Sequence, residues 1–142
     1  MKNNKGFSLV ELIVVIAIMA ILAAVAIPTF ATFITKANVA ADEDFANGVK
    51  YAVNLALTTD GEEAKTITIV MDKDNKTIET LSYTLVSDTK ETPTSYVVLG
   101  TGAPADSEIV DTIVATIDRE YKLKTDGTEV EVEGVTITIA AE

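Results

Sequence analysis

The stretch that decides this fold is LIVVIAIMAILAAVAI, the 16 consecutive apolar residues from Leu12 to Ile27. It lies inside residues 7–34, which carry a single charge, that of Glu11. As a helix, those residues would extend about 42 Å at ~1.5 Å per residue, whereas the hydrocarbon core of a bilayer is about 30 Å thick. The core helix of a soluble protein would show a polar face, and none begins here before Lys36. The sequence therefore predicts a helix inserted in a membrane.

The charges on either side of this run predict its orientation. Lys2 and Lys5 are the only charged residues before it, whereas an acidic cluster at residues 42–44 follows it. Basic residues that flank a membrane helix stay on the cytoplasmic side. We therefore expect a single-pass protein of the cytoplasmic membrane, with its N-terminus inside and everything after about Thr35 outside.

A cleaved signal peptide is a rival interpretation, because Ala24-Val25-Ala26 fits the small-x-small cleavage pattern. Two features argue against it. A signal peptide gains nothing from the carboxylate of Glu11 near the start of its apolar run, and helical periodicity continues beyond the supposed cut. The later apolar residues that share one helical stripe are Phe45, Val49, Ala52, Val53 and Ala56.

We therefore predict one helix from Phe7 to about Leu57, roughly 75 Å long at ~1.5 Å per residue. Residues 7–34 form its membrane-spanning half and residues 35–57 its amphipathic half. Pro28 lies near the junction of the two halves. Because proline removes a backbone donor, a kink or local unwinding is expected there.

Residues 58–142 are predicted to form a small head, an α+β fold with a mostly antiparallel sheet packed on the amphipathic half of the helix. Asp106 or Ser107 can cap a helix whose apolar stripe runs from Ile109 to Ile117. The phase of the last two strands flips at Glu133-Gly134, which predicts a tight turn or a bulge. The expected strands are residues 66–71, 77–86, 95–99, 130–132 and 135–139, with turns at Asp72–Lys76 and Asp126-Gly127.

Composition excludes most catalytic chemistry. The chain has 22 acidic and 11 basic residues, a net charge of −11, and neither His nor Cys. Catalytic Ser-His and Cys-His pairs and most zinc sites are therefore excluded, and broad contact with nucleic acid is not expected. Residues 72–83 begin like a calcium loop but have Thr77 and Tyr83 where glycine and glutamate belong. We predict no enzyme, no cofactor and no metal, and a solvated helix face for Asp42-Glu43-Asp44.

The segment Lys5-Gly-Phe-Ser-Leu-Val-Glu-Leu-Ile13 resembles the class III signal of type IV pilins and type II secretion pseudopilins. The shared features are a short basic leader that ends in Gly6, then Phe7, Glu11 four residues later, the apolar run, and Pro28. This resemblance covers about 30 of the 142 residues. Nothing about the head follows from it.

The resemblance implies a series of processing and assembly steps. A prepilin peptidase would cut between Gly6 and Phe7 and methylate the new amine of Phe7. Glu11 would pair with the Phe7 amine of a neighbouring subunit, and Pro28 would mark a helix segment that loosens in the filament. The chain would pass from membrane lipid, with an inner-membrane assembly platform, into a homopolymer of pilin-like subunits at the cell surface.

Several alternatives stay open. A pilus, a secretion pseudopilus and a DNA-uptake filament are not separated by the sequence. A different class is a signal-anchored membrane protein that keeps residues 1–6 and presents a small extracytoplasmic binding domain. In that case Glu11 would simply reach water near the cytoplasmic headgroups, whereas in a filament its carboxylate would have a positive partner.

Overall fold

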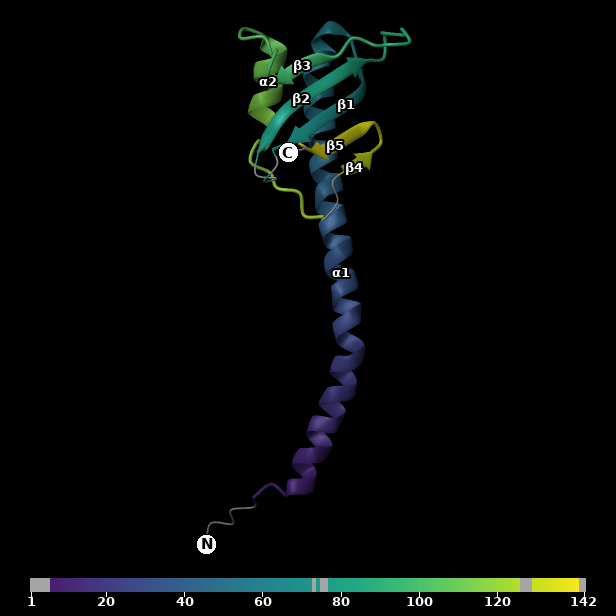
Figure 1. Cartoon of the computed structure of the whole chain (residues 1–142), viewed down its shortest axis with the longest axis vertical. Helices are drawn as coiled ribbons and strands as arrows, with labels where there is room; N and C mark the ends of the chain where they lie inside the picture. Colours follow the sequence, from purple (N-terminus) through teal and green to yellow (C-terminus); the bar gives the residue numbers. More distant parts are fainter. Residues whose placement is uncertain (1–5, 73, 75–76, 126–128, 141–142) are drawn as a thin grey trace. The chain divides into compact units, whose positions relative to one another are not determined.

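The computed structural model describes residues 6–72, 74, 77–125 and 129–140 (Figure 1). The chain divides into two compact units, Met1–Ala37 and Asn38–Glu142. The elements in chain order are α1 (Leu9–Leu57), the 3-10 turn η1 (Thr58–Asp60), β1 (Ala64–Met71), β2 (Ile78–Leu85), β3 (Tyr96–Leu99), α2 (Glu108–Thr116), β4 (Glu129–Val132) and β5 (Val135–Ile139). The fold is therefore α+β, as predicted.

Helix α1 confirms the long helix that the apolar run predicts. It begins at Leu9 rather than Phe7, because Ser8 is the residue whose side chain caps it. The helix continues through Pro28 without interruption, so the residues around this proline are not unwound here. Two threonine hydroxyls near Pro28 donate to backbone carbonyls of the same helix. The Thr29 hydroxyl donates to the carbonyl of Val25 at 2.9 Å, and the Thr32 hydroxyl donates to the carbonyl of Pro28 at 3.0 Å.

The five strands form one sheet in the order β3-β2-β1-β5-β4. The β1–β2, β2–β3 and β4–β5 pairs are antiparallel, and β1–β5 is parallel. The predicted mostly antiparallel sheet is confirmed. The parallel pair arises because the C-terminal β4–β5 hairpin adds to the free edge of β1 and not to β3, which precedes it in the chain.

The phase flip between the last two strands is a two-residue turn. Val132 pairs with Val135, and the two residues between them, Glu133 and Gly134, have φ of 38° and 89°. Positive φ at both central positions matches the right-handed twist of the strands. The ammonium of Lys50 in α1 donates to the carbonyl of Glu133 at 3.0 Å and holds the turn in place.

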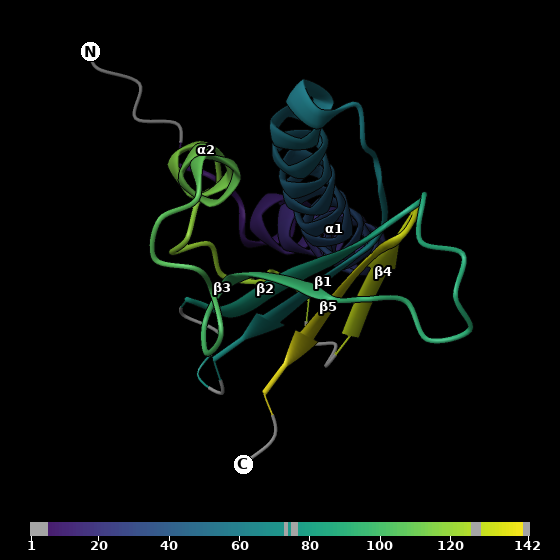
Figure 2. The same cartoon turned by 90° about the horizontal axis from the view of Figure 1, so that it is seen from above.

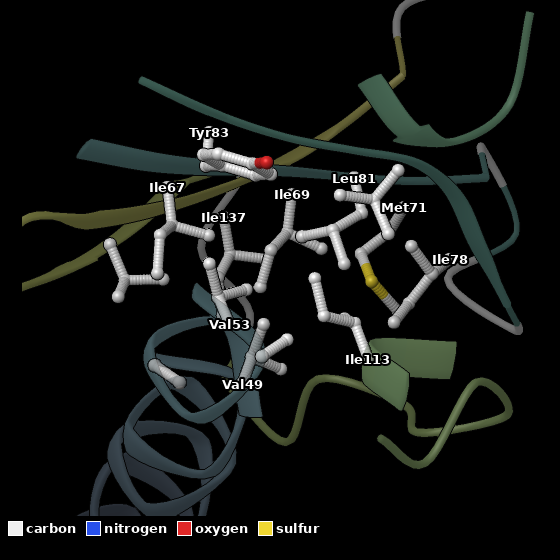
Figure 3. Packing of buried hydrophobic residues seen from close by; sticks show 14 of the residues in the cluster. Val49, Val53, Ile67, Ile69, Met71, Ile78, Leu81, Tyr83, Ile113 and Ile137 are labelled. Carbon is white, nitrogen blue, oxygen red and sulfur yellow. The ribbon is translucent and has the colours of Figure 1, made fainter. Parts of the chain in front are cut away.

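One face of the sheet carries the core, and both helices of the second unit pack on it (Figure 2). Val49 and Val53 of α1 point at Ile67 and Ile69 of β1, and Ile113 of α2 closes the far side (Figure 3). The sheet's other face is lined with hydroxyls, and those of Thr66 and Thr84 lie 2.6 Å apart. The predicted partnership between the amphipathic stripe of α1 and the sheet is confirmed.

Ser107 is the residue that caps α2, since its hydroxyl accepts from the N–H of Val110 at 3.4 Å. This decides between the two predicted caps, Asp106 and Ser107. The predicted turn at Asp126-Gly127 lies outside the described residues, as does most of the predicted turn at Asp72–Lys76.

Candidate assembly site

The predicted cleavage and assembly residues occupy the first turn of α1 and the segment before it. Gly6 and Phe7 are not helical and both are exposed, with Phe7 at 88%. A Cβ built on Gly6 would meet no atom within 4 Å. Among the residues that the structure describes, nothing covers the Gly6–Phe7 bond, so these residues leave it open to an enzyme.

Glu11 and Ser8 form a reciprocal pair at the helix start. The N–H of Ser8 donates to Oε2 of Glu11 at 2.8 Å, and the N–H of Glu11 donates to Oγ of Ser8 at 3.2 Å. This is a capping box, which satisfies two backbone donors that a helix N-terminus otherwise leaves unpaired. The Glu11 carboxylate thus has a local role within one subunit, and both residues are still exposed.

The apolar surface beside this pair is not covered by any part of the chain that the structure describes. Every large hydrophobic side chain from Leu9 to Ile34 is between 48 and 75% exposed. By length and composition α1 is able to cross a membrane, and none of its most apolar window is buried. An uncovered apolar surface of this size marks a membrane or protein interface. The apolar helix followed by a small α+β domain fits a membrane-anchored protein.

Asp42 departs from the predicted solvated helix face. Its neighbours Glu43 and Asp44 are exposed, but Asp42 is fully buried. It accepts hydrogen bonds from the hydroxyl of Tyr121 and the N–H of Lys124, and from both the N–H and the hydroxyl of Thr125, all at 2.7–2.8 Å. The prediction was wrong for this residue because its partners lie about 80 positions further along the chain.

These hydrogen bonds change the acidity of both partners. Burial alone would raise the pKa of Asp42, but the donors from Lys124, Thr125 and Tyr121 outweigh it, so the pKa is lowered. Burial and the adjacent Asp42 carboxylate raise the pKa of the Tyr121 hydroxyl. Tyr121 also stacks on Phe45, with ring centroids 4.0 Å apart. Asp42 is therefore a charged anchor that fixes residues 121–125 against α1.

The acidic residues do not assemble a metal centre in the part of the chain that the structure describes. No three carboxylates there lie close enough to hold an ion. The oxygens of Asp42 are occupied by its hydrogen-bond donors. Most of the turn that begins like a calcium loop lies outside the described residues.

Comparison with known proteins identifies the N-terminal segment. Residues 1–27 match the family model of the prokaryotic N-terminal methylation motif. No curated protein and no solved structure matches the chain. The chain therefore carries the class III signal peptide of type IV pilins and pseudopilins, and the motif with the apolar helix fits a type IV pilin-like protein. That motif implies processing by prepilin peptidase and pilin-type assembly.

The sequence analysis missed the structural roles of two residues, Ser8 and Asp42. Ser8 was detectable, because Ser-x-x-Glu before an apolar run is the signature of a capping box. Asp42 had no such signal. Its donors at residues 121–125 are brought to it only by the folding of the head.

Proposed function

We propose that this chain is a structural subunit of a type IV pilus-like filament. It is inserted in the membrane as a prepilin, with its N-terminus inside and its head outside. Prepilin peptidase cleaves it after Gly6 and methylates Phe7, and the mature chain polymerises through its N-terminal helix. The protein is structural and has no catalytic role.

The observation that carries the proposal is the match of residues 1–27 to the methylation motif. The uncovered apolar surface of α1 supports it, because that surface needs lipid before assembly and other subunits afterwards. Cleavage removes Lys2 and Lys5, so the formal charge changes from −11 to −13. A single amine at the helix tip then replaces the two lysines that anchor the precursor.

In an apolar bundle, the Phe7 amine and the Glu11 carboxylate are both poorly solvated, and each makes the other tolerable. The capping box leaves this pairing feasible, because the Ser8 N–H engages only Oε2 of Glu11 and the second oxygen has no described partner. A neighbour in the wrong register would leave both charges unpaired. Removing one partner of a buried pair costs about 3–5 kcal/mol. Apolar packing supplies the cohesion and the ion pair sets the register.

The test is the mass of the N-terminal peptide of the mature protein, purified from its native host. A peptide that starts at a methylated Phe7 supports the proposal. A peptide that starts at Ile27 instead identifies a secreted protein with an ordinary signal peptide. An unclipped monomer that keeps residues 1–6 identifies a signal-anchored membrane protein.

A further inference from the structure

The head has a hollow between the end of α1, the start of α2 and strands β2 and β3. Both helices lie on the same face of the sheet (Figure 2), and this α1–α2 hollow opens where α1 ends. Its volume is about 470 Å³, within the range of ~300–1,000 Å³ that is typical of small-molecule sites. Apolar side chains reach it from all three sides, from Leu57 of α1, Leu85 of β2, and Ile109 and Val110 of α2. The hollow is therefore large enough and apolar enough to hold the body of a small ligand.

The hydroxyl of Tyr83 is a polar group without a partner at this hollow. The residue lines the hollow, belongs to the core (Figure 3) and is only 7% exposed. Its hydroxyl makes no hydrogen bond in the part of the chain that the structure describes. No fully buried side-chain oxygen lacks a partner among the described residues, so the Tyr83 hydroxyl keeps its remaining exposure toward the hollow. Burial raises the pKa of this hydroxyl, and the neighbouring Tyr96 and Asp60 raise it further, so it stays protonated. A buried hydroxyl that lacks a hydrogen bond costs free energy, and this one is available to a ligand.

Two carboxylates border the same hollow. That of Asp60 is exposed and has no hydrogen-bond or salt-bridge partner among the described residues. Glu62 is half-buried, and its Oε2 accepts from the hydroxyl of Ser87 at 2.7 Å. The described residues that line the hollow include no lysine or arginine. The Asp60 carboxylate and the Tyr83 hydroxyl oxygen are therefore both free to accept hydrogen bonds from a positively charged donor. A primary ammonium is such a group, because it carries three N–H donors and no acceptor.

We infer that the α1–α2 hollow binds a small organic cation, a primary ammonium group carried on an apolar alkyl or aryl body. The ammonium donates to the Asp60 carboxylate and to the Tyr83 hydroxyl oxygen, and the body packs on Leu57 and on Ile109 of α2. An anion is repelled by the two carboxylates and by the net charge of −11. A neutral alcohol reaches the Tyr83 hydroxyl but leaves the Asp60 carboxylate without a positive partner. Because the site lies within one head, it does not depend on the proposed filament.

The first test is an NMR titration of the full-length, isotope-labelled chain in detergent with phenethylammonium. Backbone amide signals at the hollow, such as those of Leu85 and Val110, should shift and saturate. The signal of Glu131 in β4, at the edge of the sheet opposite β3, should not shift.

Two matched probes separate the features of this ligand. Phenethyl alcohol has the same body without the charge, and trimethylated phenethylammonium has the charge without the N–H donors. Each should bind about tenfold more weakly, because it loses a hydrogen bond that involves a charged group. Equally tight binding of either probe, or the absence of a saturable shift with phenethylammonium, overturns the inference.

The second test changes the two acceptors in the same detergent, which keeps any partition of the probe into micelles constant. Asp60→Asn and Tyr83→Phe preserve the shape of each side chain, and each should weaken phenethylammonium binding by about tenfold. Tyr83→Phe should keep the urea midpoint of the unmodified chain, because its hydroxyl has no described partner to lose. Asp44→Asn, at an exposed carboxylate outside the hollow, is the matched control and should bind as the unmodified chain does. Unchanged binding in both Asp60→Asn and Tyr83→Phe overturns the inference. The proposed function is unaffected by that result, because no filament enters the assay.

Discussion

Helix α1 contains two kinds of surface and two kinds of carboxylate. Before Ala37 its large apolar side chains are all exposed, and among the described residues the Glu11 carboxylate accepts from Ser8, three positions before it. After Asn38 one face is buried on the sheet, and Asp42 accepts four hydrogen bonds from its own chain. The head buries its core within the described chain, whereas the large apolar side chains of the N-terminal segment stay exposed. Within α1, the part after Asn38 therefore folds with the head, whereas the part before Ala37 keeps its apolar side chains available for assembly.

The largest expected effect is on processing of the N-terminal segment, because one substitution there should abolish cleavage completely. Gly6→Leu should abolish cleavage, because it replaces the glycine that ends the leader of the class III signal. The open space around Gly6 means that leucine there strains nothing in the chain itself. The measurement is the ratio of precursor to mature protein on a denaturing gel. Gly48→Leu, at another glycine with open space, is the matched control and should be processed normally.

Removing the intramembrane charge should abolish filaments while leaving the monomer intact. We expect Glu11→Ala to insert and be cleaved but to form no filaments, because the Phe7 amine of its neighbour loses its partner. Electron microscopy of sheared surface material and an immunoblot of processed protein give the two readouts.

Glu11→Gln separates the two roles of this side chain. Glutamine can still complete the capping box but carries no charge. If Glu11→Gln forms normal filaments, the pairing role is wrong and the cap alone matters. Glu43→Ala, at an exposed position of the same helix, should assemble as the unmodified chain does.

Substitution of Asp42, the anchor in the head, should instead have a large effect on the stability of the folded chain. Asp42→Ala leaves part-buried donors from Tyr121, Lys124 and Thr125 without their acceptor, and we expect it to lower the free energy of unfolding by about 3 kcal/mol. Urea unfolding of the detergent-solubilised chain, followed by tyrosine fluorescence, measures it. Asp44→Ala, at the exposed neighbour, should stay within about 0.5 kcal/mol of the unmodified chain. Equal losses in the two variants would refute the anchor.

The same anchor predicts a dependence on pH. The pKa of Asp42 is lower in the folded head than the ordinary aspartate value of about 3.9. Its contribution is therefore fully present above that value and disappears as the pH falls through the lower folded pKa. As the pH is lowered below about 4, the urea midpoint of the unmodified chain should fall more steeply than that of Asp42→Asn. Parallel curves for the two proteins would contradict the assignment.

The smallest expected effect concerns the cap. Ser8→Ala removes the oxygen that accepts the N–H of Glu11, which costs about 1 kcal/mol of local helix stability. Amide hydrogen exchange of Glu11 and Leu12, whose N–H groups both donate to Ser8, should quicken in detergent micelles by about fivefold, the equivalent of that energy. Ser8→Thr keeps the hydroxyl and should exchange at the original rate. No change in Ser8→Ala would show that the cap contributes nothing in a micelle.

The sequence by itself determined the elements whose signals are local. Sixteen apolar residues in a row require a nonpolar surrounding, and alternating Ile67 and Ile69 require a strand with one buried face. The order Gly6-Phe7 with Glu11 predicts the processing segment. The Ser8–Glu11 box belongs to the same group, because its partners are three residues apart.

Only the tertiary structure decided the contacts between distant residues. The parallel pairing of β5 with β1 and the seat of residues 121–125 on Asp42 join positions roughly 70 to 80 apart in the chain. Nothing local favours one such pairing over another, since strand edges and buried carboxylates accept any donor that packing brings to them. In the part of the chain that the structure describes, this packing buries the core and leaves no buried side-chain nitrogen or oxygen without a hydrogen-bond partner.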